Sequence, residues 1–366
     1  MRYLYFFFVL LLLLFIYNFE SYSLPRFATK QRNKCIDCHY NPTGGLMRNE
    51  NGFYYGQNIL SMTSPRSDEF TMSPKLNDNI SIGMDLRGQF LYSQEKNRTD
   101  FQRMEGTIYT NINLSKKINV LTKYDFVNQS WEAFGVARIL PNDSYIKIGS
   151  FQPNYGIRLD DHTAYTRGGD FALLYTTGAR QGLIYDPLYL EAGMELGIYI
   201  SNFMFITTSA GSNLYNRTLT KDPSFTARME ITPSIGRIGL LFGGSYAIAS
   251  APGRTNFYGG FAGIGYNRFS LLGELDRAND LRAPNMKSNV YMVQASYLII
   301  VGLEAIVRYD RFEPDITDGR KNIAHLVAGF EFIPYSFIEI RPQYRFIIEN
   351  PSVDNDAVVV QMHIWY

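Results

Sequence analysis

Two cysteines and one histidine are the residues of this chain whose types and spacing point most directly to chemistry. Cys35 and Cys38 are the only cysteines among the 366 residues, and His39 directly follows the second. Cys-x-x-Cys-His is the spacing of c-type haem attachment. The two thiols add across the vinyl groups of one haem, and the adjacent imidazole becomes the proximal ligand of the iron. We therefore predict one covalent haem c, bound by Cys35, Cys38 and His39.

A redox-active disulfide and a zinc site are the other structures that a close cysteine pair suggests. A disulfide across two intervening residues would be strained or redox-active, and it would give His39 no role. A structural zinc ion needs four ligands, and His39 is the only adjacent candidate. Haem attachment is therefore the preferred interpretation, with a redox disulfide or a fortuitous spacing as alternatives.

The second axial ligand of this haem is less well defined by the sequence. The three remaining histidines lie far from the motif, whereas Met47, Met62 and Met72 lie close to it. Thioethers ligate haem iron in cytochromes c, although most methionines only fill gaps in a core. Met47 or Met62 is the distal candidate, and a five-coordinate iron is the alternative. The basic residues Arg32, Lys34 and Arg48 either pair with haem propionates or are solvated loop charges.

Composition and the N-terminus exclude several classes of protein. The formal net charge of +1 gives no basic face for nucleic acid, so we expect no nucleic-acid partner. The mean hydropathy of -0.16 excludes a bundle of membrane helices. The single long apolar run, Tyr3 to Tyr17, follows Arg2 and predicts a signal peptide over residues 1–23, cut near Ser23–Leu24. A retained N-terminal anchor is the alternative; both place the mature chain outside the cytoplasm.

The segment 24–78 carries the haem motif but is too short to form a sizeable apolar core alone. From Asn79 to the end, apolar and polar residues alternate with period two. In the stretch Val301–Asp310, for example, apolar residues alternate with Glu304 and Arg308. The alternating segments are about 10 residues long and are separated by turns, which is typical of transmembrane β-barrels. We therefore predict a haem segment over 24–78 and a porin-like antiparallel barrel over 79–366.

The connections between these segments support the barrel. Short turns such as Ser115–Lys117, Asn267-Arg268 and Ile333–Tyr335 alternate with longer polar loops such as Asn213–Pro223. Outer-membrane barrels have short periplasmic turns and longer external loops, so the alternation predicts the bacterial outer membrane as the location and its lipid as a partner. The last strand ends in Tyr366, as in the terminal strands by which such barrels are recognised for insertion.

Alternation of strand direction fixes the expected number of strands. A barrel with both ends in the periplasm needs an even number. Counting from both ends places Gln152–Glu191 outside, as one long loop that folds into the lumen or contains a hairpin. This predicts 16 strands, with 18 as the alternative. Within the loop, Asp160, Asp161 and His162 either anchor the loop by hydrogen bonds or hold a transient metal ion, and we favour the anchor.

The order of a signal peptide, one Cys-x-x-Cys-His motif and a porin-sized barrel resembles the fused monohaem cytochrome–porins. The resemblance rests on this order and on residues 35–45 and 150–169. It implies a haem segment that plugs or caps the barrel and moves electrons across the outer membrane. The implied partners are a periplasmic cytochrome or other redox protein and an extracellular electron donor or acceptor, such as Fe(II). This would be an electron-transfer protein, with iron oxidase as a further implied activity.

Two other functions are compatible with the same parts. The chain is alternatively a diffusion porin, with the N-terminal segment as a tethered periplasmic cytochrome or a segment without haem. A third interpretation is a redox enzyme with an open haem site. A hydrocarbon layer about 30 Å thick is far wider than one haem, so a haem partway up the lumen would serve electron transfer better than one at the mouth.

Overall fold

The computed structural model describes residues 27, 30, 34–64, 73–159, 161, 163–169, 182–213, 222–249, 254–281, 283–319 and 322–366. The predicted signal peptide, Arg32, Met72, Asp160 and His162 lie outside these residues. No helix of the described part is both long enough and apolar enough to span a bilayer.

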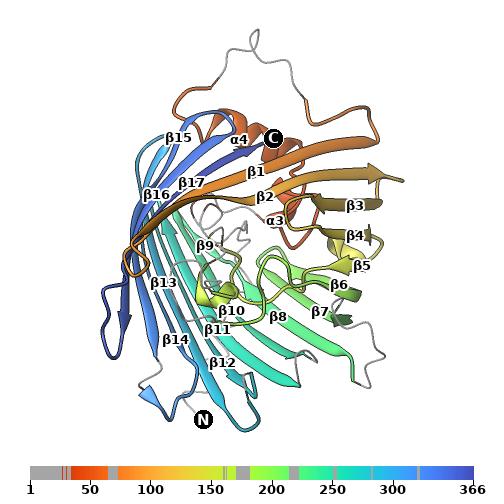
Figure 1. Ribbon diagram of the computed structural model, residues 1–366. Helices are drawn as coiled ribbons and strands as arrows, with labels where there is room; N and C mark the ends of the chain where they lie inside the picture. Colours follow the sequence, from red (N-terminus) through yellow and green to blue (C-terminus); the bar gives the residue numbers. More distant parts are fainter. Residues whose placement is uncertain are drawn as a thin grey trace.

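The described residues include two short helices and a long series of strands (Figure 1). The helices are α3 (Cys35–Cys38) and α4 (Glu50–Asn58), with 3-10 turns η1 (Pro141–Asp143) and η2 (Tyr165–Arg167). The strands are β1 (Ile80–Ser93), β2 (Arg98–Asn113), β3 (Ile118–Asp125), β4 (Ser130–Ala137), β5 (Tyr145–Phe151), β6 (Glu191–Ser201), β7 (Met204–Asn213), β8 (Ser224–Ile231), β9 (Ser234–Ile235), β10 (Ile238–Ala249), β11 (Thr255–Tyr266), β12 (Phe269–Asn279), β13 (Lys287–Ile300), β14 (Leu303–Glu313), β15 (Ile323–Tyr335), β16 (Ile338–Glu349) and β17 (Ala357–Trp365).

The strands close into one antiparallel barrel. Each strand pairs with its neighbour in the chain, and β1 pairs with both β2 and β17, which closes the sheet. The two-residue β9 continues β8, because both pair with β10. The described residues therefore form 16 strands, as the sequence predicts, and not 18.

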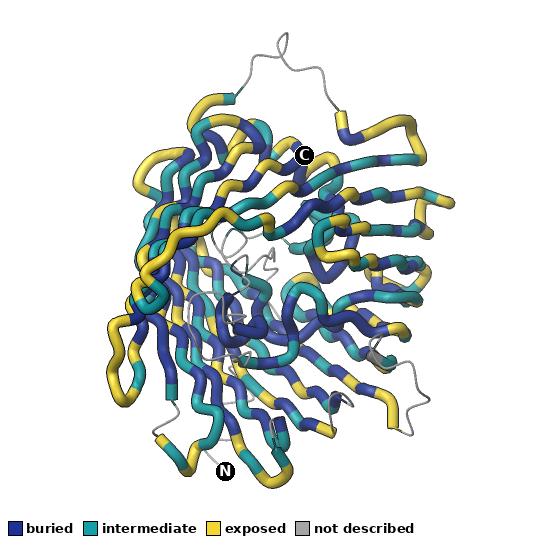
Figure 2. Tube along the Cα trace, viewed as in Figure 1, coloured by how far each residue is buried: buried dark blue, intermediate teal, exposed yellow. Residues whose placement is uncertain are grey.

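Residues along the strands alternate between more buried and more exposed, as the banding in Figure 2 shows, which is expected when successive side chains face the lumen and the outer surface in turn. On β17, Met362 and Ile364 are exposed, whereas His363 and Trp365 are buried inside the barrel. The outward residues are mostly apolar, including exposed Leu, Ile, Val and Phe side chains on most strands. An apolar outer band around a polar interior is the arrangement of a membrane-spanning barrel.

Connection lengths differ between the two ends of the barrel. At the end where β1 begins and β17 ends, tight turns such as Asn267-Arg268 join the strands, whereas the other end has longer loops. This short-turn end corresponds to the periplasmic end of outer-membrane barrels. One predicted turn is wrong: Ile333–Tyr335 belongs to β15, and the turn falls at Ser336-Phe337. The alternating pattern continues through Tyr335, so the strand is longer than expected.

The connection between β5 and β6, residues 152–190, is the inner loop. Its described part folds into the lumen, where Tyr155, Ile157 and Tyr165 are buried. Figure 1 shows this coil inside the ring of strands. Of the two predicted forms of this loop, the described residues adopt the loop folded into the lumen.

Residues 34–64, here called the plug, pack at the short-turn end of the barrel. Helix α4 places Phe53 against Phe337 of the β15–β16 turn and Tyr366 at the C-terminus, with ring centroids 5.0 and 5.7 Å apart. After α4, the plug runs along the barrel rim, where the backbone N–H of Met62 donates to the carbonyl of Ile333. Figure 1 shows α4 beside the C-terminus.

Candidate functional site

The cysteine pair lies on one turn of helix. Helix α3 begins after Lys34, whose backbone N–H donates to the Asp37 carboxylate at 2.7 Å, and it ends where the N–H of His39 donates to the carbonyl of Cys35. Residues three apart on a helix lie on the same face. Cys35 and Cys38 are therefore neighbours along one side of α3, and they are not joined by a disulfide.

A tight hairpin follows the motif. His39 pairs with Arg48 in an antiparallel bridge, and the N–H of Tyr40 donates to the carbonyl of Met47. The turn between them contains Gly44, whose φ of 79° lies in the left-handed region that favours glycine. A Cβ there would lie 3.3 Å from the Cys35 sulfur, so this turn lies close against the cysteine pair.

Asn49 joins α3 to α4. Its side chain caps α4 by accepting from the N–H of Gly52 at 3.0 Å, and its amide donates to the carbonyl of Ile36 at 3.0 Å. Its backbone N–H donates to the carbonyl of Cys38. A Cβ at Gly52 would lie 2.1 Å from that carbonyl oxygen, so only glycine allows the two helices to pack this closely.

Long-range contacts hold the plug to the barrel wall. Arg138, beyond β4, donates to the carbonyl of Tyr40 at 2.7 Å. Lys147 of β5 donates to the Thr43 hydroxyl at 3.3 Å and forms an ion pair with Glu195 of β6 at 2.6 Å. Both side chains of this ion pair are fully buried. The plug is thus fixed by polar contacts in addition to the aromatic packing of α4.

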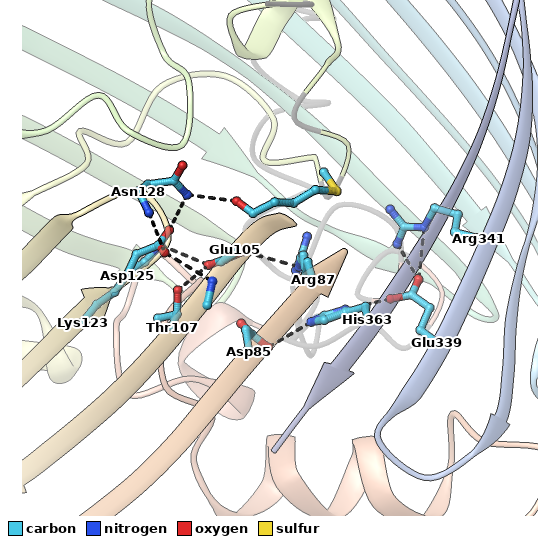
Figure 3. Close-up of polar contacts among 12 residues, drawn as sticks. Asp85, Arg87, Glu105, Thr107, Lys123, Asp125, Asn128, Glu339, Arg341 and His363 are labelled. Atoms are coloured by element: carbon cyan, nitrogen blue, oxygen red, sulfur yellow. Dashed lines mark hydrogen bonds and ion pairs between the residues drawn. The ribbon is translucent and has the colours of Figure 1, made fainter. Parts of the chain in front are cut away.

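A cavity of about 310 Å³ lies between the plug and the lumen wall. Cys38 and His39 line it from the plug, together with Arg48. The wall contributes charged residues of both signs and an aromatic ring; among them are Asp85, Arg87, Glu105, Lys123, Glu339, Arg341, His363 and Trp365. Figure 3 shows several of these side chains on β1, β2, β3, β16 and β17. The haem motif therefore faces a polar interior.

The imidazole of His39 is held neutral. Burial, followed by the guanidinium groups of Arg48 and Arg158, lowers the pKa of His39 to about 4. Its Nδ1 is buried, and no described residue hydrogen-bonds to it. A metal-ligating histidine must be neutral, with one nitrogen available. The state of His39 fits that requirement.

The pKa of the Cys38 thiol bears on whether the cysteine pair has a redox role. Burial raises the pKa of the Cys38 thiol, and the charge of Asp37 raises it further. Redox-active cysteine pairs instead depend on a lowered thiol pKa. Within the described ranges, no three Cys, His, Asp or Glu side chains are grouped to hold a metal ion.

The inner loop contributes Arg158 to the same cavity. A Cβ at Gly45 would lie 2.7 Å from its guanidinium nitrogen, so Arg158 lies directly against the plug. Asp161 anchors the loop through Arg308 of β14 and Arg345 of β16, at 3.0 and 3.4 Å. This arrangement matches the anchor expected for Asp161.

The methionine candidates lie away from the cavity. Met47 is buried between the plug and β1, where a Cβ at Gly83 would lie 2.8 Å from its sulfur. Met62 is exposed at the rim. Sequence reasoning missed the cluster of Asp85, Glu339 and His363, because only the closure of β1 on β17 brings these residues together.

Comparison with known proteins gives the fold but no close relative. No protein-family model and no curated protein sequence matches the chain. The barrel is similar to Pseudomonas putida OprB (TM-score 0.59, 10% identity, covering 79% of this chain and 94% of that chain). It is also similar to Vibrio cholerae OmpT (TM-score 0.55, 10% identity, 80% and 100% covered) and to Salmonella typhi OmpF in complex with daunomycin (TM-score 0.54, 12% identity, 79% and 98% covered). The chain therefore has a porin-like β-barrel fold.

Proposed function

We propose that this barrel lies in the bacterial outer membrane and carries electrons through one covalently bound c-type haem. The observation that supports this best is the placement of Cys38 and His39 on a charged cavity inside a membrane-spanning barrel. A neutral imidazole with a buried, unpartnered nitrogen fits an iron ligand, and the cysteine pair on one helical face fits two thioether bonds. Haem c, when bound, accepts and releases one electron.

The residues of the plug have separate roles in this proposal. The Cys35 and Cys38 thiols would hold the haem through thioether bonds to its two vinyl groups, and His39 would supply a nitrogen ligand to the iron. Arg48 and Arg158 lie beside His39 and provide positive charge for the propionates.

The direction of transfer is set by partners on the two sides of the membrane. The plug lies at the short-turn end, which suits exchange with a periplasmic cytochrome or other redox protein. An extracellular donor or acceptor, such as Fe(II), would react at the opposite end. The inner loop occupies the space between these ends.

Two measurements test this function. The purified protein, produced with the cytochrome c maturation machinery, should retain haem on a denaturing gel, and Cys35→Ala with Cys38→Ala should abolish the haem stain. In sealed liposomes, it should transfer electrons between an internal and an external redox dye at a rate above that of the cysteine variant. A protein without covalent haem would refute the proposal.

A diffusion channel is the second candidate, favoured by the similarity of the barrel to porins. Planar-bilayer conductance distinguishes the two. Because the plug and the inner loop both occupy the lumen, the electron-transfer proposal predicts low conductance that rises when residues 24–72 are deleted. High conductance of the intact chain, with no covalent haem, would favour the diffusion channel.

A further inference from the structure

We propose that His363, on the last strand of the barrel, is the second axial ligand of the haem iron. This inference rests on the proposed haem function and identifies the barrel wall, not the plug, as the source of the distal ligand. In that arrangement, the haem bridges two structural units: His39 ligates from the plug and His363 from β17.

The position of His363 is the first support. Strand alternation points it into the lumen, and it lines the same cavity as Cys38 and His39. Of the three histidines in the described residues, His325 does not line this cavity. Its Nε2 instead lies 2.8 Å from the Tyr165 hydroxyl of the inner loop.

A layer of two side chains connects the two cavity histidines. Arg48, which pairs with His39 across the hairpin, places its guanidinium carbon 5.5 Å from the ring centroid of Trp365. The Trp365 ring in turn lies 5.0 Å from the ring of His363. The buried Nε1 of Trp365 has no hydrogen-bond partner among the described residues. His39 and His363 are therefore linked through one arginine–tryptophan contact.

The contacts of His363 are those of a metal-ligating imidazole. Its Nδ1 lies 2.9 Å from Glu339, and Arg341 donates to the other oxygen of this carboxylate at 2.6 Å (Figure 3). Ligating histidines generally donate their second N–H to a carboxylate, which fixes the ring and strengthens the ligand. Glu339 and Arg341 provide that support.

Coordination to iron would use the opposite nitrogen of His363. Nε2 lies 3.0 Å from Asp85, and coordination to iron would replace this single contact. Asp85 would keep a partner, because Tyr109 donates its hydroxyl to the other carboxylate oxygen at 2.5 Å. A buried carboxylate without a hydrogen bond would be costly. The exchange creates no such group, because Asp85 keeps its hydrogen bond with Tyr109.

The spectrum of the wild-type haem is the first test. We expect a low-spin ferric haem with bis-imidazole electron paramagnetic resonance and no thioether charge-transfer band. His363→Ala should give high-spin haem that binds carbon monoxide and returns to low spin with added imidazole. His363→Met should introduce the thioether band. His325→Gln, a buried luminal histidine outside the cavity, is the matched control and should leave the spectrum unchanged.

Glu339→Gln tests the supporting role of the Glu339 carboxylate by its effect on the reduction potential of the haem. Loss of its charge weakens donation from His363, so the ferrous-to-ferric ratio at a fixed potential should rise about tenfold, or 59 mV for one electron. Heat-modifiable migration on gels verifies that each barrel is folded.

Covalent haem with a thioether band, or with high-spin iron in the wild type, would overturn the His363 assignment and leave the electron-transfer proposal intact. Both of these outcomes are observed on the wild-type protein, so they would overturn the assignment even if the variants fail to fold. Absence of covalent haem would overturn both proposals.

Discussion

Arg308 of β14 donates a hydrogen bond to Asp161 of the inner loop across 3.0 Å, joining residues 147 positions apart. Both side chains are almost completely buried, and Arg345 lies 3.4 Å from the same carboxylate oxygen. One carboxylate therefore contacts two wall guanidinium groups in the lumen, and Asp310 lies 3.7 Å from Arg308 as well. The Asp161 contact is one of several that hold the inner loop against the wall, since Arg167 of the loop also pairs with Glu274 of β12 at 3.0 Å.

Asp161→Asn should loosen the inner loop at this contact with the wall. Breaking a buried ion pair by removal of one partner costs about 3–5 kcal/mol, since the remaining charges are left without compensation. We expect a larger and noisier single-channel conductance in planar bilayers. Asp222→Asn is the control: Asp222 forms an exposed ion pair with Arg254 at 3.1 Å, and such pairs contribute about 0–1 kcal/mol. Equal conductance changes in both variants would contradict the anchor.

Acid should release the same contact. Burial alone would raise the pKa of Asp161, but Arg308 and Arg345 outweigh it and hold the pKa well below its usual value. A carboxylate with a lowered pKa stabilises the folded state above its unfolded pKa of about 3.9 and loses this effect as the pH falls through the folded pKa. Conductance should therefore be constant from neutral pH to about pH 4 and increase only below it. A rise between pH 5 and 7 would show that another group controls the loop.

The barrel was predictable from the sequence because its signals are local. On β17, alternation alone predicts that Met362 and Ile364 face lipid while His363 faces the lumen. The number of strands follows from the alternation of strand direction along the chain. This alternation requires the inner loop to be one connection between two strands, with no further strand inside it. The turn at Ser336-Phe337 differs from the expectation, and β7 extends to Asn213, which was expected to begin a loop.

The site was less predictable because its contacts are distant in sequence. Thr43 and Lys147 are separated by 104 positions, and nothing in either segment indicates that they meet. His363 is far from Cys38 in the sequence, yet closure of the barrel brings both residues to one cavity. Met47 is close in sequence but packs against β1.

Gly52→Ala should separate helix α4 from α3. Alanine normally stabilises a helix by about 1 kcal/mol relative to glycine. Here its Cβ would lie 2.1 Å from the Cys38 carbonyl oxygen, and such overpacking costs about 1–3 kcal/mol. The fraction of chains that retain haem on a denaturing gel should fall severalfold, while heat-modifiable migration of the barrel stays normal.

Gly135→Ala provides the matched control, because a Cβ at this position on β4 meets nothing within 4 Å. It should retain haem as the wild type does. Equal haem retention in the two alanine variants would show that close packing of α4 on α3 is not needed for attachment.

Lys147 and Glu195 should show strong coupling in a double-mutant cycle. They lie 2.6 Å apart with both side chains fully buried, and Tyr145 also donates to Glu195 at 2.8 Å. Lys147→Met leaves a buried carboxylate without its cation, so we expect a loss of about 3–5 kcal/mol in the free energy of unfolding. Adding Glu195→Gln removes the uncompensated charge and should restore part of that loss. Denaturant unfolding in lipid vesicles, followed by tryptophan fluorescence, measures the cycle, and additive effects of the two substitutions would show that the pair does not act as a unit.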